Sequence, residues 1–279
     1  MVPSRGSRWV VPTEAPEKVR DAITGFRRAA AGDPQVVASF IGGSYATATW
    51  DEHSDLDLYL IVADDHYDDV FARRLSFLEA MGRVVLAEDF DGFGFDMVVF
   101  MLADGVEGEL GFARRTKFLH IHAGAYGVLE DPGSLLDGVT FPPQRPTPEQ
   151  RIRSLQRTVA WFWRQLSLFA TAAARGRSWT AYGYLEQARR EAVDLVWWMD
   201  APDSWPGGYE KLEVRLGGER LSAIATTLVG LDPAGQWTAA ESMAEFMAQH
   251  GRSACAAADC RYPDLLEATV RTKLRSLRH

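Results

Sequence analysis

The 279-residue sequence has little cysteine and no long apolar run. Its two cysteines, Cys255 and Cys260, cannot supply a disulfide framework or the four ligands of a structural zinc site, so we expect reduced thiols without a function. No stretch approaches the roughly 18 apolar residues that a membrane span requires, and residues 1–16 lack the apolar core of a signal peptide. The sequence therefore predicts a soluble, cytoplasmic protein that has no membrane partner.

Positive charge is also scarce. Lysine and arginine together number 30 against 38 aspartates and glutamates, which gives a formal net charge of −8. Proteins that bind polymeric nucleic acid neutralise phosphates with clustered positive charge, so this balance argues against such a partner. The hydrophobic share of 47% and the charged share of 24% are those of an ordinary globular protein with one large domain or two medium ones.

The periodicity of the apolar residues changes at a proline-rich segment, residues 141–150, which we interpret as a linker. Before it, alternating and β-branched runs predict strands at residues 35–41, 55–62, 83–86, 95–102 and 126–129. The same half contains expected helices at residues 14–31, 67–81 and 106–118. Beyond the linker, spacing near 3.6 predicts helices at residues 149–176, 179–200, 219–229, 235–250 and 262–277. We therefore predict an α+β fold, with a mixed β-sheet and flanking helices over residues 1–143 and an α-helical bundle over residues 144–279.

The most informative stretch is FIGGSYATATWDEHSDLDLYLIV, residues 40–62. A predicted strand ends in Gly42, Gly43 and Ser44, whose backbone amides and hydroxyl are suited to phosphate oxygens. The next predicted strand opens with Asp55 and Asp57, which lie on one face because side chains alternate along a strand. Paired carboxylates of this kind bind Mg²⁺ together with substrate phosphates. The stretch thus predicts a site for a nucleoside triphosphate with magnesium.

This run resembles the signature of the polymerase-beta-like nucleotidyltransferase superfamily: a hydrophobic residue, Gly, Gly or Ser, nine to thirteen residues, then two aspartates that alternate with hydrophobic residues. With Gly43 and Ser44 as the pair, residues 45–54 form the intervening stretch. The superfamily also has a third acid between hydrophobic residues on a neighbouring strand, and Asp96 matches it. A buried, unpaired aspartate costs several kcal/mol, which a metal would offset. The resemblance implies that Asp55, Asp57 and Asp96 are catalytic and bind Mg²⁺.

The order of a sheet domain and a helical domain is similar to that of antibiotic nucleotidyltransferases acting on aminoglycosides and lincosamides. In such enzymes a carboxylate outside the metal set acts as general base, and a lysine or arginine of the second domain contacts the triphosphate. The resemblance implies Glu186 as the base, since residues 182–198 place it with Arg189 on one helical face near the edge of a cleft. It implies Lys211 and Arg189 as nucleotide-binding cations, beside Gly42, Gly43 and Ser44. A solvated ion pair between Glu186 and Arg189 is the alternative.

Two further pairs of residues are interpreted as structural. His120 and His122 have no metal-binding pattern around them, so we expect hydrogen-bonded or exposed histidines. Glu107 and Glu109 stand at the start of the expected helix over residues 106–118, where acidic side chains favour the helix dipole, although substrate binding by Glu109 remains open.

The implied reaction is the Mg²⁺-dependent transfer of a nucleoside monophosphate, AMP from ATP, to a hydroxyl of a small molecule with release of pyrophosphate. An aminoglycoside or a lincosamide is the expected acceptor, and the protein is expected to be a monomer or a homodimer. Two alternatives stay open: a protein adenylyltransferase, and a non-catalytic nucleotide-binding module with the same fold.

Overall fold

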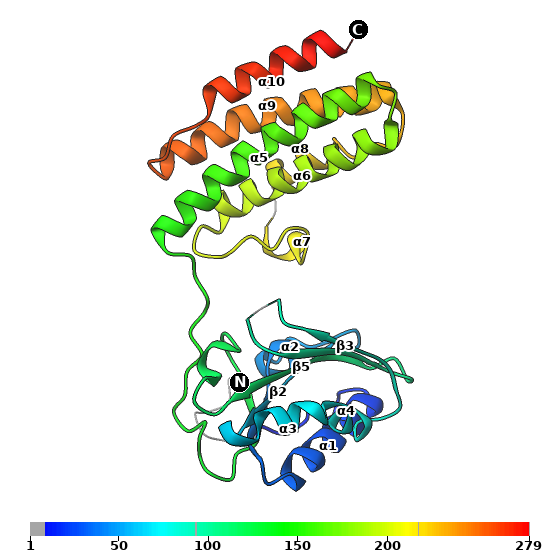
Figure 1. Ribbon diagram of the computed structural model, residues 1–279, viewed down its shortest axis with the longest axis vertical. Coiled ribbons are helices and arrows are strands. Elements are labelled where there is room, and N and C mark those ends of the chain that lie inside the picture. Colours follow the sequence, from blue (N-terminus) through cyan, green and yellow to red (C-terminus); the bar gives the residue numbers. More distant parts are fainter. Residues whose placement is uncertain (1–8, 93, 217, 279) are drawn as a thin grey trace. The chain divides into compact units, whose positions relative to one another are not determined.

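The computed structural model describes residues 9–92, 94–216 and 218–278 (Figure 1). It divides into two compact units, Met1–Pro143 and Gln144–His279, called unit 1 and unit 2 below. The predicted α+β class is confirmed, because unit 1 contains a mixed sheet with flanking helices and unit 2 is helical. Within the three described ranges, no helix has both the length and the apolar character needed to cross a membrane.

Unit 1 is built on a six-stranded sheet with the strand order β3-β4-β5-β2-β1-β6. Strands β2 and β5 are parallel, and the other neighbouring pairs are antiparallel. The strands are β1 (Val36–Ile41), β2 (Leu56–Val62), β3 (Val84–Phe90), β4 (Met97–Leu102), β5 (Glu107–Arg114) and β6 (Gly127–Glu130). Because β5 separates β2 from β4, residues of β2 and β4 are not direct neighbours across the sheet.

Helices cover one face of this sheet, called the helix face (Figure 1). They are α1 (Glu17–Gly32), α3 (Tyr67–Ala72) and α4 (Arg74–Glu79). Their apolar side chains pack against Leu58 and Leu60 of β2 and Phe112 of β5. The expected helix over residues 67–81 is thus two short helices, which meet at Arg73.

The opposite face of the sheet, called the open face, is covered in part by the chain that follows β5. Phe118, Ile121 and Phe141 from that segment pack against Phe40 of β1 and Ile61 of β2. Side chains alternate along β2, so Asp57 and Tyr59 share the open face with Ile61. Asp57, one of the carboxylates predicted to bind magnesium, therefore lies on the face that the helices leave uncovered.

The helix expected over residues 106–118 is wrong, because residues 107–114 form strand β5. A Cβ atom on Gly108 would lie 2.2 Å from the carbonyl oxygen of Leu56, so a glycine is needed where β2 and β5 approach each other. Pairing of β5 with β2 on one side and β4 on the other satisfies its backbone groups along its length. This tertiary pairing overrides the local preference of two glutamates for the start of a helix.

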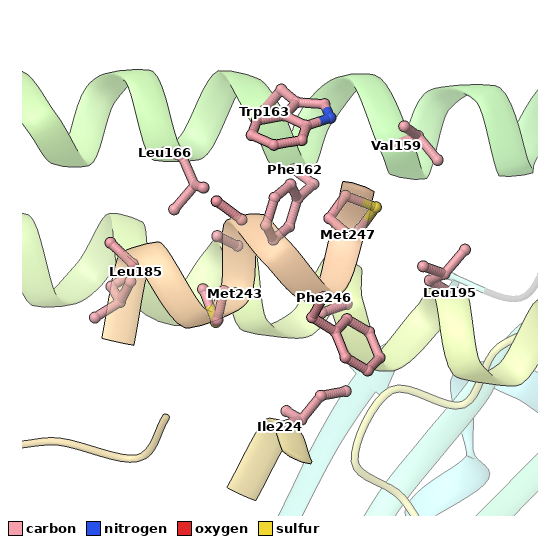
Figure 2. Packing of buried hydrophobic residues seen from close by; sticks show 14 of the residues in the cluster. Val159, Phe162, Trp163, Leu166, Leu185, Leu195, Ile224, Met243, Phe246 and Met247 are labelled. Carbon is pink, nitrogen blue, oxygen red and sulfur yellow. The ribbon is translucent and has the colours of Figure 1, made fainter. Parts of the chain in front are cut away.

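Unit 2 is a bundle of helices with one apolar core. Its helices are α5 (Pro148–Ala174), α6 (Ser178–Asp200), α7 (Leu212–Arg215), α8 (Glu219–Ala225), α9 (Pro233–Ala257) and α10 (Asp264–Leu277). Helix α5 starts with a capping box, in which the Thr147 hydroxyl accepts from the Gln150 amide and the Gln150 side chain accepts from the Thr147 amide. Figure 2 shows Phe162 of α5 pointing towards Met243 and Met247 of α9, which belong to the same apolar cluster as Leu185 of α6.

Candidate active site

The turn between β1 and helix α2 (Gly43–Thr47) is shaped by its contact with β2. The Gly42 amide donates a hydrogen bond of 2.8 Å to the carbonyl oxygen of Asp57. Gly43 has φ +57°, and a Cβ atom there would lie 1.7 Å from Oδ2 of Asp57. Glycine is required here for two reasons: a side chain would collide with this carboxylate, and the left-handed backbone conformation of the turn disfavours other residues. The two halves of the predicted phosphate and metal site are therefore in direct contact.

Two hydroxyl groups behind this turn are buried. Ser44 Oγ and the Tyr45 hydroxyl have no hydrogen-bond partner among the described residues. A buried polar atom left without a partner costs about 1–3 kcal/mol, a cost that a phosphate oxygen would remove at Ser44. The Tyr45 ring stacks on Trp50 with a centroid distance of 5.6 Å, which anchors the loop leading to Asp55. Burial, assisted by the charges of Asp51 and Asp55, raises the pKa of Tyr45.

The carboxylate next to Asp57 across the sheet is that of Glu109. The two residues are direct partners in the parallel pairing of β2 and β5, so they share the open face at the strand spacing of about 4.8 Å. Burial, followed by the charges of Asp57 and Glu109, raises the pKa of Tyr59, which indicates that all three side chains are close together. Asp55 is exposed and directly precedes β2. The structure thus places Asp57 against Gly43 and pairs it with Glu109, while Asp55 lies just before the start of the same strand.

The structure does not bring Asp96 to this group. Its carbonyl oxygen accepts the Phe112 amide at 2.8 Å, which places it three residues, about 10 Å, beyond Glu109 along β5. Its carboxylate accepts a 2.6 Å hydrogen bond from the Tyr67 hydroxyl, and Tyr67 belongs to the helix face. The sequence predicts that a metal offsets the cost of burying Asp96, but the hydrogen bond from Tyr67 does so instead. Glu109 lies where the third acid was expected.

The donor set suits Mg²⁺, a hard cation that prefers carboxylate oxygens. In the part of the chain that the structure describes, no three carboxylate, imidazole or thiol groups converge closely enough to form a complete metal site. Mg²⁺ usually keeps several waters and is bound through one or two carboxylates plus substrate phosphates. Asp57 and Glu109, paired across the sheet beside the predicted phosphate-binding turn, match that mode of binding.

In unit 2, Glu186 and Arg189 form a closed network on α6. The Arg189 side chain is 3% exposed and pairs with Glu186. Its Nε donates to the Thr227 hydroxyl at 3.1 Å and its Nη2 to the Thr227 carbonyl at 2.7 Å. The second oxygen of Glu186 accepts from the Tyr209 hydroxyl at 2.5 Å. Arg189 therefore lies in the interior of unit 2 and not near a cleft edge as expected, and its guanidinium nitrogens are already occupied.

Lys211 has a different environment. Its side chain is 65% exposed, and its ammonium lies 3.6 Å from a carboxylate oxygen of Glu210. The backbone of Lys211 is in the left-handed region with φ +52°. The loop that carries it is fixed to α6, because the Trp197 indole donates to the Gly208 carbonyl at 2.9 Å. A role of Lys211 in nucleotide binding and a role of Glu186 as general base remain predictions.

No protein-family model and no curated protein matches the chain. Among solved structures, the chain is similar to an aminoglycoside 6-adenyltransferase from Bacillus subtilis, with 14% identity and a TM-score of 0.45 over 92% of this chain and 96% of the other. It is also similar to a nucleotidyltransferase-like protein from Exiguobacterium sibiricum, with 12% identity and a TM-score of 0.34 over 92% and 88% of the two chains. Because both TM-scores are below 0.5, we base the functional assignment on this chain's own residues.

Proposed function

We propose that the protein is a nucleotidyltransferase that moves a nucleoside monophosphate, AMP from ATP, to a hydroxyl group of a small molecule. The observation that carries this proposal is the contact between two elements of one site: Asp57, paired in register with Glu109, lies against Gly43 of the Gly42–Ser44 turn. A turn of two glycines followed by a serine hydroxyl without a partner suits a triphosphate, and the adjacent carboxylates suit the cation that accompanies it.

Each part of this site has a distinct task in the proposed reaction. The Gly43 amide and the Ser44 hydroxyl bind the triphosphate, the Gly42 amide holds the turn to the Asp57 carbonyl, and Asp55, Asp57 and Glu109 hold Mg²⁺. When bound, Mg²⁺ supplies charge neutralisation for the triphosphate and lowers the pKa of the acceptor hydroxyl. The acceptor hydroxyl gives up its proton to solvent and its oxygen bonds to the α-phosphorus, the bond between that phosphorus and the oxygen bridging to the β-phosphorus breaks, and pyrophosphate leaves. Asp96 has no task in this scheme.

The proposed acceptor is a hydroxylated small molecule of the aminoglycoside or lincosamide type. The net charge of −8 favours a cationic acceptor such as an aminoglycoside. This choice of acceptor follows from charge and from the sequence resemblance.

Mass spectrometry tests the reaction directly. The full chain is incubated with Mg²⁺, each of the four nucleoside triphosphates and a pool of aminoglycosides and lincosamides. We expect one compound to gain the mass of one nucleoside monophosphate, with pyrophosphate release, and we expect no gain with Asp57→Asn or in excess chelator. Label on a protein band would instead indicate protein adenylylation, and Mg²⁺-dependent ATP binding without any product would indicate a binding module. Absence of nucleotide binding would refute the proposal.

A further inference from the structure

The backbone of Gly42 is enclosed by side chains from β2 and from the segment after β5. A Cβ atom on Gly42 would lie 2.7 Å from Cε1 and 3.1 Å from Nδ1 of His122, and 3.2 Å from Cε2 of Tyr59. Both rings are therefore in contact with the glycine that begins the proposed triphosphate-binding turn. His122 is 80 residues away in sequence, so this contact is a product of the tertiary fold.

The His122 ring has a defined orientation and protonation state. Its Nε2 lies 2.8 Å from the carbonyl oxygen of Ala125. A carbonyl only accepts, so Nε2 carries the proton and donates this hydrogen bond. Burial lowers the pKa of His122, which favours the neutral ring. Nδ1, the nitrogen nearer to Gly42, is then without a proton.

Aromatic side chains hold the same ring from other sides. His122 lies 5.1 Å from Tyr59 and 5.2 Å from Phe141 between ring centroids. Tyr59 in turn stacks on Phe40 at 4.5 Å with nearly parallel planes. Since β2 carries Tyr59 two residues after Asp57, this stack connects the Gly42 turn to the strand that carries the proposed metal ligands.

We propose that His122 is a positioning residue for nucleotide binding: its ring, anchored to Ala125, holds Gly42 against Tyr59 and so fixes the Gly42–Ser44 turn in the conformation that accepts the triphosphate. The inference rests on the proposed function. His122 acts through the turn and does not touch the reacting atoms. The turn contacts the triphosphate equally before and during transfer, so loss of His122 weakens binding more than it slows the chemical step.

The test uses the full chain with three variants. His122→Ala removes the ring and its hydrogen bond, His122→Gln keeps a donor at the distance of Nε2, and His120→Ala removes an exposed histidine of the same segment as a control. We expect His122→Ala to raise the KM and the Kd for the nucleoside triphosphate about tenfold, the effect of about one lost hydrogen bond with its packing, while kcat changes less than about threefold. His122→Gln recovers most of the affinity, and His120→Ala matches the wild type.

The outcomes separate this inference from the proposed function. Circular dichroism and thermal unfolding show whether each variant is folded, and His122→Gln provides a folded variant if His122→Ala is not. If the wild type binds nucleotide and both His122 variants bind it equally well, the inference is wrong while the proposed function stands. A fall in kcat with unchanged KM would also overturn it. If the wild type binds no nucleotide, the proposed function fails and the inference fails with it.

Discussion

Unit 1 and unit 2 each contain a group of polar side chains that the sequence singles out, and the two groups differ in how their hydrogen bonds are used. In unit 2 all of the Arg189 nitrogens donate to Glu186 or Thr227, so the network is complete within the chain. At the Gly42–Ser44 turn, two buried hydroxyls have no partner in the described ranges. The Arg189 network stabilises unit 2, whereas Ser44 follows the two glycines of the turn and has hydrogen-bonding capacity that a phosphate oxygen would use in the proposed function.

The largest expected effect concerns the third carboxylate of unit 1. Replacing Glu109 by Gln removes a charge beside Asp57 and should lower the rate of nucleotide transfer by about a thousandfold, which corresponds to ~4 kcal/mol of transition-state stabilisation. Asp96→Asn, the matched control, should keep most of the activity, because the Asp96 carboxylate accepts a hydrogen bond from Tyr67 on the helix face. Initial rates of transfer under saturating Mg²⁺ decide the point. A large loss in Asp96→Asn with normal activity in Glu109→Gln would reverse the assignment.

The second expected effect is on stability. Arg189→Met removes a buried cation, the donor to Oε2 of Glu186 and the donor to the Thr227 carbonyl, so we expect the free energy of unfolding to fall by about 3 kcal/mol. Exposed Arg153→Met on α5 is the control, with a change below about 0.5 kcal/mol. Urea titration followed by circular dichroism measures both variants.

Glu186→Gln separates the structural role of this network from catalysis. If Glu186 only orders unit 2, the variant loses about 1 kcal/mol of stability and keeps its kcat. If Glu186 is the general base, kcat falls by about a hundredfold or more while the protein remains folded. A stable Arg189→Met variant would contradict the description of the network as structural.

Much of the fold follows from sequence periodicity, and the exceptions have a physical cause. The strand at residues 55–62 and the long helices of unit 2 have clear patterns, and the structure contains them. Strand β5 has only a weak alternating pattern, since its glutamates favour a helix start and its glycines carry no side chain. Its conformation is determined by pairing with β2 and β4, which no local pattern reports.

The candidate site was predictable in part for the same reason. Gly43, Asp55 and Asp57 belong to one short stretch, so the sequence predicts them together. Glu109 and His122 join them only through the order of the strands and the packing of the segment after β5. The alternation of Glu109 and Gly111 with Leu110 and Phe112 was the one available signal for a strand. Asp96 is an acid in an apolar run, which is the pattern of the third acid, but its carboxylate accepts a hydrogen bond from Tyr67.

A smaller effect is expected from two carboxyls of α6. Burial raises the pKa of Glu191 to about 7, with a further contribution from Asp194, and burial raises the pKa of Asp194 to about 6. The folded state therefore binds protons at these carboxyls more tightly than the unfolded state. Below about pH 4 both states are protonated and the groups cost no stability, whereas the stability falls as the pH rises through 6 and 7. Relative to the wild type, Glu191→Gln with Asp194→Asn should gain about 1–2 kcal/mol at pH 8, allowing for partial exposure, and almost nothing at pH 4.

Thermal or urea unfolding at both pH values measures that difference. The control is Glu213→Gln, an exposed glutamate of the same unit, which should show no dependence of this kind. A gain at pH 4 equal to that at pH 8 would mean that packing and not proton binding is responsible.

The smallest effect concerns Lys211. Its side chain is exposed, whereas Arg189, the other predicted nucleotide-binding cation of unit 2, is buried. Lys211→Gly removes the side chain and relieves a left-handed backbone conformation, so stability should rise by about 0.5 kcal/mol. Lys211→Ala removes the ammonium and keeps the strain, so it should show no such gain. If the ammonium binds the triphosphate, both variants raise the KM for nucleotide severalfold and reduce its salt dependence. An unchanged KM in both would leave Lys211 as a strained loop residue, and all nucleotide contacts would then be sought in unit 1.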